Sequence, residues 1–307
     1  MGGTKLSRLS EKLGRVLLPL VTPFGDDGAI DHAKAAALAQ MVIERGYCDS
    51  IIVGGTTGEF YALTMEERLE LLKTIRQAVR DRVPLIAGTG APNTDHAIML
   101  TRAAEEIGYP VAMVVAPYYS KPTQQEIARH FERVAASTKL PIMLYNIPLF
   151  TGVNIDPATV VRLAQVQNII AIKEEAGINP TQTSEYVLQT PPHFDVYCGD
   201  DTMVIATLGQ GAVGVVSGGS HIIGDMMKQM IAAYFEGQIE VAKELHLKLF
   251  RFFKALGGKG RVNPIPVLRA AISMTWQDVG PPRAPQLSAD DDERKALSEV
   301  LRTLGKL

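Results

Sequence analysis

Residues 169–173 read Ile-Ile-Ala-Ile-Lys, four apolar residues followed directly by a lysine. An apolar run without polar alternation predicts a strand that is buried on both faces, as in a parallel sheet covered by helices. Seven more runs of this kind recur along the chain: Val16–Leu20, Ser50–Val53, Pro84–Ala87, Val111–Val115, Pro141–Tyr145, Phe194–Tyr197 and Ala212–Val216. The sequence therefore predicts eight buried strands.

Segments with helix-start signals lie between these runs. Thr64–Glu67 and Thr123–Glu126 have the Thr-x-x-Glu pattern of a capping box. Asp156–Pro157 and Asn179–Pro180 each place a capping residue before a proline, which favours a first helical turn. After the last strand, residues 225–235 have the pattern of an eighth helix. Strands and helices therefore alternate, which is typical of a parallel sheet.

Eight strand–helix units in roughly 220 residues match the size of a TIM barrel, and this (β/α)8 barrel is the fold that we expect. A doubly wound open sheet is the alternative, and it would need a dinucleotide fingerprint or another switch-point site. The Gly-x-Gly-x-x-Gly string at Gly209–Gly214 comes before a predicted strand instead of joining a strand to a helix. Its amides cannot then stand at a helix N-terminus, so we reject a nucleotide site there.

The chain divides, in this interpretation, into three parts. An N-terminal arm comprises residues 1–14, the barrel residues 15–236, and a C-terminal helical extension residues 237–307. A proline-rich loop within the extension precedes a last helix at about residues 290–304. We expect the extension to pack on the barrel and not to form an independent domain.

The composition is that of an ordinary globular chain, with 46% hydrophobic and 21% charged residues and a net charge of −2. Because basic residues are not in excess, we expect neither nucleic acid nor a membrane surface as a partner. The N-terminus lacks the apolar region of a secretion signal, which predicts a cytoplasmic protein. The two cysteines, Cys48 and Cys198, suit reduced, packed thiols, with a disulfide as the alternative. The scattered histidines have no metal-ligand spacing, so we expect no metal and no cofactor.

Lys173 lies at the end of the sixth predicted strand. In a TIM barrel the carboxyl ends of the strands carry the active site, so this lysine should point to the barrel mouth. Desolvation there favours the neutral amine, which is the nucleophile that attacks a ketone to form an imine. The other interpretation is a lysine that pairs with Glu174 or Glu175, or that extends to solvent.

Three other strand ends carry polar groups. Tyr145 ends the fifth strand, where its hydroxyl can relay a proton or simply be a buried aromatic. The second strand runs into Gly54–Glu59, a turn whose amides and threonine hydroxyls can hold a carboxylate, or which is only a tight turn. Tyr118 and Tyr119 follow the fourth strand and suit packing or an interface. Together, an amine, two phenols and a carboxylate cradle on one rim favour imine chemistry on a 2-oxo acid such as pyruvate.

Six motifs along the chain resemble the dihydrodipicolinate synthase and N-acetylneuraminate lyase family of class I aldolases. They stand in the family's order over about residues 16–304: Gly55–Glu59, Pro117–Tyr119, Leu144–Pro148, Ile172–Glu174, Gly199–Asp201 and Asn263–Val267. The resemblance implies a TIM barrel, no cofactor, pyruvate and an aldehyde as substrates, and a homotetramer built as a dimer of dimers.

The resemblance also implies the role of each site residue. Lys173 would form the Schiff base, and Tyr145 would move protons at the reacting carbonyl. Thr56 and Thr57 would hold the substrate carboxylate, and Tyr119 would complete a proton relay across a subunit interface. The remaining pocket residues would be Gly55, Phe150, Gly199 and Val216.

Two departures from the family pattern bear on the substrate. Synthases of the family place an arginine two residues after Pro148, where it binds a substrate carboxylate, but this chain has Phe150. Phenylalanine cannot offer a bidentate fork, so we expect a 2-keto-3-deoxy sugar acid aldolase. The allosteric lysine site of feedback-inhibited synthases would fall at Met65, Arg68, Pro92 and His96, so lysine feedback is not expected.

Several alternatives stay open from the sequence. The enzyme could be a true 4-hydroxy-tetrahydrodipicolinate synthase, which joins pyruvate to aspartate semialdehyde, or a deoxy-keto sugar acid dehydratase. A non-catalytic paralogue that binds a 2-oxo acid is a further option. A metal-dependent barrel enzyme is the last, although the histidine spacing does not favour it.

Overall fold

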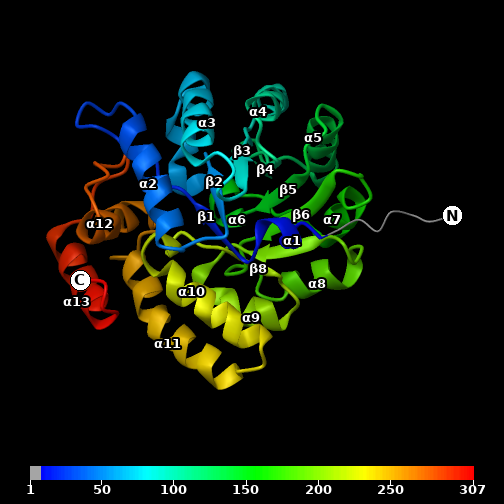
Figure 1. Ribbon diagram of the computed structural model, residues 1–307. Helices are drawn as coiled ribbons and strands as arrows, with labels where there is room; N and C mark the ends of the chain where they lie inside the picture. Colours follow the sequence, from blue (N-terminus) through cyan, green and yellow to red (C-terminus); the bar gives the residue numbers. More distant parts are fainter. Residues whose placement is uncertain (1–7) are drawn as a thin grey trace. The chain divides into compact units, whose positions relative to one another are not determined.

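The computed structural model describes residues 8–307 (Figure 1). Eight parallel strands are hydrogen-bonded in chain order and close into a barrel. They alternate with helices, and a helical segment follows them, so the predicted TIM barrel is confirmed. The strands are β1 Val16–Pro19, β2 Ser50–Val53, β3 Leu85–Gly88, β4 Val111–Val115, β5 Ile142–Asn146, β6 Ile169–Glu174, β7 Asp195–Cys198 and β8 Gly214–Val216.

The helices and 3₁₀ turns of the described residues follow the same order. They are α1 Ser10–Leu13, α2 His32–Glu44, η1 Thr56–Gly58, η2 Phe60–Ala62, α3 Met65–Val79, α4 Thr94–Ile107, α5 Gln124–Ala136, α6 Pro148–Thr151, α7 Pro157–Leu163, α8 Gln182–Gln189, η3 Asp201–Met203, α9 Val204–Gly209, α10 Ser220–Phe235, α11 Ile239–Leu256, α12 Ile265–Thr275 and α13 Asp291–Thr303. The arm predicted at residues 1–14 lies partly outside the described residues.

The helix-start signals are mostly confirmed. Thr64 and Thr123 each cap a helix in a complete capping box, with the glutamate side chain bonded back to the cap amide. The signal at Asn179–Pro180 is wrong, because α8 begins two residues after the proline and Asn179 only accepts the Gln182 amide through its carbonyl. Helix α10 begins at Ser220, earlier than predicted, and its first turn is separated from the rest by non-helical backbone at Ile223. The helix predicted at residues 225–235 therefore corresponds only to the part of α10 after this break.

The chain divides into two compact units by its internal contacts. The first comprises the residues up to Leu17 and Pro84–Val216, and holds β3 to β8 with helices α4 to α9. In this unit the alternate residues Leu144, Ile172 and Val196 pack against the covering helices in one apolar cluster. Since successive side chains of a strand point to opposite faces, Tyr145 and Lys173 face the barrel interior.

The second unit comprises Leu18–Val83 and Ser217–Leu307. It holds α2, α3 and the C-terminal helices, among which α10 packs beside α11, and α12 beside α13 (Figure 1). No helix among residues 8–307 combines the length and the apolar character that crossing a membrane requires. Gly209 ends helix α9 and Gly214 begins β8, so the rejected Gly-x-Gly-x-x-Gly string indeed lies ahead of a strand.

Candidate active site

The two best-placed reactive side chains lie on neighbouring strands. Tyr145 on β5 pairs in register with Lys173 on β6, and both are interior residues with 2% and 6% of their surface exposed. The Lys173 Nζ lies 3.9 Å from the centroid of the Tyr145 ring. The alternative of a solvent-extended lysine is therefore wrong. The structure thus brings the predicted amine and the predicted phenol ring together in buried surroundings.

Gly199, after β7, is the residue that the Lys173 stem crosses. A Cβ at this position would lie 2.8 Å from the Lys173 Cε and 3.0 Å from the Glu174 carbonyl oxygen. The Gly199 amide donates to that same carbonyl over 2.6 Å. Any side chain here would make the Lys173 stem shift, because only glycine leaves this space open. The sequence identified Gly199 only through the family resemblance.

The sequence reasoning gave Glu175 no role at the site beyond a pairing with Lys173. This residue is buried, and its Oε1 accepts the Gly177 amide over 3.1 Å. Burial raises the pKa of the Glu175 carboxyl, and the Asp200 carboxylate raises it further, whereas the Lys173 charge lowers it. Its Oε2 has no hydrogen-bond partner within residues 8–307. The side of Lys173 toward β7 is thus acidic.

Phe150 lies on α6, directly after β5, and is 40% exposed. The same loop contains Gly152, and a Cβ at Gly152 would lie 3.7 Å from the Lys121 Cε. Lys121 is exposed and has a positive φ of 50°. An ammonium group thus stands beside the loop where the family's arginine is missing, which the sequence pattern did not suggest.

Tyr119 is the most exposed large apolar side chain of the described residues, with 94% of its surface accessible. Its φ is 72°, a conformation that costs a non-glycine residue of order 1–3 kcal/mol. Such strain persists where other contacts fix the backbone, and it clusters at functional segments. Within a single chain the Tyr119 hydroxyl therefore lies on an exposed, constrained loop.

The second unit holds the glycine–threonine turn after β2. Gly54 has a φ of 73°, and Thr56 and Thr57 begin the short 3₁₀ turn η1. Glu59 closes this turn in a left-handed conformation, with a φ of 56°. Its buried carboxylate accepts the Arg269 guanidinium over 2.9 Å, and burial raises the pKa of Glu59 against the opposing Arg269 charge. A fixed turn suits the predicted carboxylate cradle.

Val216 is the remaining residue that the sequence predicts to line the pocket. Val216 ends β8 in the first unit, where it is buried and pairs with Leu17. In the second unit, the Cβ position of Gly218 lies 3.8 Å from the Thr57 hydroxyl oxygen. Nearby, the His221 ring accepts the Val21 amide at Nε2, which leaves its Nδ1–H to donate to the Gly218 carbonyl over 2.8 Å. Burial lowers the pKa of His221 to about 4, so this ring is a neutral structural group.

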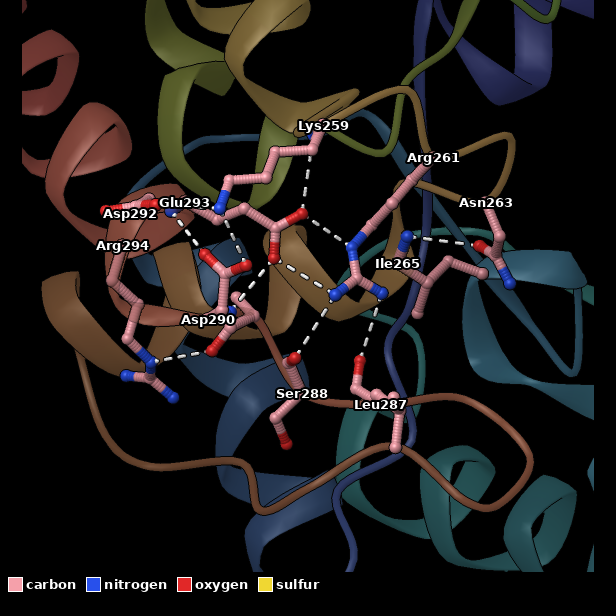
Figure 2. A network of polar contacts seen from close by, with 11 residues as sticks. Lys259, Arg261, Asn263, Ile265, Leu287, Ser288, Asp290, Asp292, Glu293 and Arg294 are labelled. Atoms are coloured by element: carbon pink, nitrogen blue, oxygen red, sulfur yellow. Dashed lines mark hydrogen bonds and ion pairs between the residues drawn. The ribbon is translucent and has the colours of Figure 1, made fainter.

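Arg261, in the loop before α12, is engaged in a polar network of its own (Figure 2). Its guanidinium contacts both carboxylate oxygens of Glu293, at 2.6 and 3.0 Å, and donates to the carbonyls of Leu287 and Ser288. Lys259 joins the same network through Asp290 and Asp292 (Figure 2). Arg261 therefore ties the loop before α12 to α13 and is no replacement for the missing arginine.

Known proteins that match this chain do so over nearly its whole length. The family model of the Dihydrodipicolinate synthetase family matches residues 12–304. The 4-hydroxy-tetrahydrodipicolinate synthases of Desulforudis audaxviator and Thermosynechococcus vestitus are 43% and 44% identical over 94% and 96% of this chain, and 97% and 98% of their own length. The crystal structure of dihydrodipicolinate synthase DapA-2 from Bacillus anthracis has a TM-score of 0.89, with 42% identity over 94% of this chain and 98% of that one.

A further solved relative is the lysine-bound dihydrodipicolinate synthase of Cyanidioschyzon merolae, with a TM-score of 0.91 and 38% identity over 96% of this chain and 99% of that one. The barrel and these relatives define a class I, Schiff-base-forming lyase or aldolase that depends on pyruvate. The chain belongs to the dihydrodipicolinate synthase family.

The contact at Gly199 makes a direct prediction about the lysine. Gly199→Ala should keep the fold but displace the Lys173 amine, and, if this amine is the one that reacts with pyruvate, should slow that reaction by about 10- to 100-fold. Borohydride trapping of pyruvate measures this rate. Gly257→Ala is a matched control, because its Cβ meets only the Lys254 carbonyl oxygen at 3.4 Å. Equal trapping rates for both variants would show that the lysine has room to move.

Proposed function

We propose that Lys173 is the residue that forms the Schiff base with pyruvate and that Tyr145 moves protons beside it. The observation that supports these roles is the 3.9 Å contact between the Lys173 amine and the Tyr145 ring, within the barrel interior. The register of β5 and β6 holds both groups at one level. The family resemblance implies the same roles for these two residues.

The proposed reaction has four steps. The neutral amine of Lys173 attacks the ketone carbon of pyruvate, and the carbinolamine loses water to give an imine. A proton leaves the methyl carbon of the imine, and the enamine that forms adds to an aldehyde carbonyl. Water then hydrolyses the new imine and frees the amine. In each transfer Tyr145, whose ring lies against the amine, would give or accept the proton.

The remaining site residues have proposed binding roles. Thr56 and Thr57, with the Gly55 backbone, would bind the substrate carboxylate, as the fixed turn between Gly54 and Glu59 allows. Gly199 and Val216 would line the pocket. The proposed enzyme uses no cofactor, since the lysine itself supplies the electron sink.

Trapping tests the nucleophile. Lys173→Ala should form no reduced pyruvate adduct, because no other amine would take its place. Mass spectrometry after borohydride treatment with pyruvate measures the adduct. Lys139→Ala, at an exposed lysine of the same unit, should keep the wild-type adduct. A reduced adduct in Lys173→Ala would show that the nucleophile lies elsewhere.

For the acceptor, the comparisons favour aspartate semialdehyde and thus 4-hydroxy-tetrahydrodipicolinate synthase activity. Relatives of that name are 40–44% identical over most of the chain. The expectation of a sugar acid aldolase has no support among them and rests mainly on Phe150, with the departures at the expected lysine site. Lys121 supports the synthase assignment, because its ammonium beside Gly152 can bind the acceptor's carboxylate as a point charge.

Variants of Lys121 and Phe150 distinguish between the candidate acceptors. If Lys121 binds the acceptor carboxylate, Lys121→Met should raise the KM for aspartate semialdehyde by about 10-fold and leave pyruvate trapping unchanged. Phe150→Arg should raise kcat/KM for this substrate by roughly 10- to 100-fold, since a charge-assisted hydrogen bond contributes about 1.5–3 kcal/mol. Leu149→Arg is the charge control on the same exposed helix.

A coupled assay with aspartate semialdehyde, glyceraldehyde and a deoxy-keto sugar acid measures these changes. Native turnover of glyceraldehyde above aspartate semialdehyde would favour the aldolase. Loss of water from the sugar acid without cleavage would favour the dehydratase. An adduct without turnover of any of the three would favour a non-catalytic pyruvate-binding protein.

We further propose a cytoplasmic homotetramer in which Tyr119 reaches a neighbouring subunit. The support is the 94% exposure of Tyr119 on a constrained loop, and, for the compartment, two buried thiols that form no disulfide. Burial raises the pKa of both Cys48 and Cys198 to about 12, so neither is a thiolate.

Sedimentation velocity should show a tetramer. Tyr119→Phe should keep this assembly and the pyruvate adduct but lower kcat by about 10- to 100-fold, because it removes a proton donor. Steady-state turnover measures the loss. A monomer in solution, or unchanged turnover in the variant, would contradict the relay.

A further inference from the structure

A buried polar network lies on the outer side of the strands that carry Tyr145 and Lys173. The next residue on each strand, Asn146 on β5 and Glu174 on β6, is fully buried, and the two pair in register. Successive side chains alternate, so these two point toward the covering helices while Tyr145 and Lys173 point inward. Whatever fixes the outer pair therefore fixes the inner pair.

The network connects β5 and β6 to α8 and to the loop before α7. The Asn146 amide nitrogen lies 2.8 Å from Glu174 Oε2, and the Gln182 amide nitrogen lies 3.3 Å from Glu174 Oε1. Gln182 also donates to the Tyr186 hydroxyl over 2.7 Å, and both amides reach Asn154 Oδ1. Glu174 thus stands at the centre of a network in which every partner is an uncharged polar group.

The amide hydrogens in this network are shared among several acceptors. The amide groups of Asn146 and Gln182 each face three acceptors: Asn154 Oδ1, a Glu174 oxygen and the Tyr186 hydroxyl oxygen. Each amide has only two hydrogens. The Tyr186 hydroxyl already donates its own hydrogen to the Ile155 carbonyl, over 2.6 Å. Each Glu174 oxygen thus faces one shared, uncharged amide donor, so ionisation would place a charge in a buried site against neutral partners.

The charges around Glu174 also oppose its ionisation. Burial and, to a smaller extent, the neighbouring Glu175 raise the pKa of this carboxyl to about 8, against the lowering effect of the amide donors. The titratable groups that face the network from α8 and the loop before α7 are Tyr186, Glu185 and Asp156, and none is a cation. On β7, Cys198 pairs with Glu174 and remains a neutral thiol.

We propose that protonated Glu174 is a positioning residue, which acts through this network to hold the ends of β5 and β6 and so aligns Lys173 with Tyr145. The main chain transmits the effect directly. The Glu174 carbonyl accepts the Gly199 amide that lies under the Lys173 stem, and the Glu175 amide donates to the Asn146 carbonyl over 3.0 Å. Ionisation places a charge in the network without a counterion, which loosens both strand ends.

The decisive variant is Glu174→Gln, which keeps the shape of the carboxyl and a donor hydrogen at every pH. The inference rests on the proposed Schiff-base function. Wild type and variant should trap pyruvate at similar rates at pH 7. Between pH 7 and 9 the wild-type rate should fall about tenfold relative to the variant, as the protonated fraction of Glu174 declines. Glu185→Gln, an exposed position on α8, is the matched control and should follow wild type.

The pH dependence of thermal unfolding measures the protonation of Glu174 independently of catalysis. The folded pKa of Glu174 lies above its ordinary value of 4.5, so its contribution to stability is complete below about pH 4.5 and is lost as pH rises to about 8. The Tm of wild type relative to Glu174→Gln should therefore decrease between pH 5 and 8 and then level off. A Tm difference that is independent of pH would overturn the proposal.

A second variant keeps the test decisive if Glu174→Gln does not fold. Gln182→Met removes a donor that stabilises the carboxylate, so the alkaline loss of trapping should move to higher pH. The role of Glu174 is overturned if the pH of this loss is the same in Gln182→Met as in wild type. It is also overturned if the ratio of the trapping rates of wild type and Glu174→Gln does not change with pH. Neither result bears on the proposed Schiff-base function. Absence of a pyruvate adduct in wild type at every pH overturns the proposed function and this role together.

Discussion

The parallel pairing of β5 with β6 is the constraint on which the site depends. It sets Tyr145 opposite Lys173 in register, so an amine and a phenol share one level of the barrel interior. A strand has a side-chain period of two, and a slip of one residue would turn both groups toward the helices. The apolar cluster of Leu144 and Ile172 with the covering helices makes such a slip costly, because it would bury polar groups in their place.

The same alternation of side chains places the reactive pair on the inner face of β5 and β6, and the polar groups that hold these strands on the outer face. Residues one position beyond the reactive pair, Asn146 and Glu174, enter a buried polar network that includes Gln182 on α8. Polar groups in such a setting are stable only when each finds its partner, so the network fixes one arrangement of the strand ends. Gly199 adds a steric limit on β7, where only the absence of a side chain leaves room for the Lys173 stem. The turn after β2 is fixed in a comparable way by the buried pair of Glu59 and Arg269.

Much of the secondary structure could be predicted from the sequence alone. All eight strands were located within two residues of their observed ends, because buried parallel strands leave continuous apolar runs. The capping boxes at Thr64 and Thr123 were equally visible, since their signal is contained within four residues. The start of α8 was misplaced, because Pro180 falls in a turn ahead of the helix, where the Asn179 carbonyl accepts the Gln182 amide. The preference for a sugar acid came mainly from Phe150, without the lysine that stands near its loop.

The sequence by itself determined the barrel and the two strand ends that carry Lys173 and Tyr145, because periodicity and strand termination are local properties of the chain. Only the tertiary structure decided how these groups are held. The contact of Lys173 with Gly199, the approach of Lys121 to Gly152, and the network around Glu174 each join segments that are far apart in sequence. Their partners follow from strand register and helix placement, which no local pattern specifies.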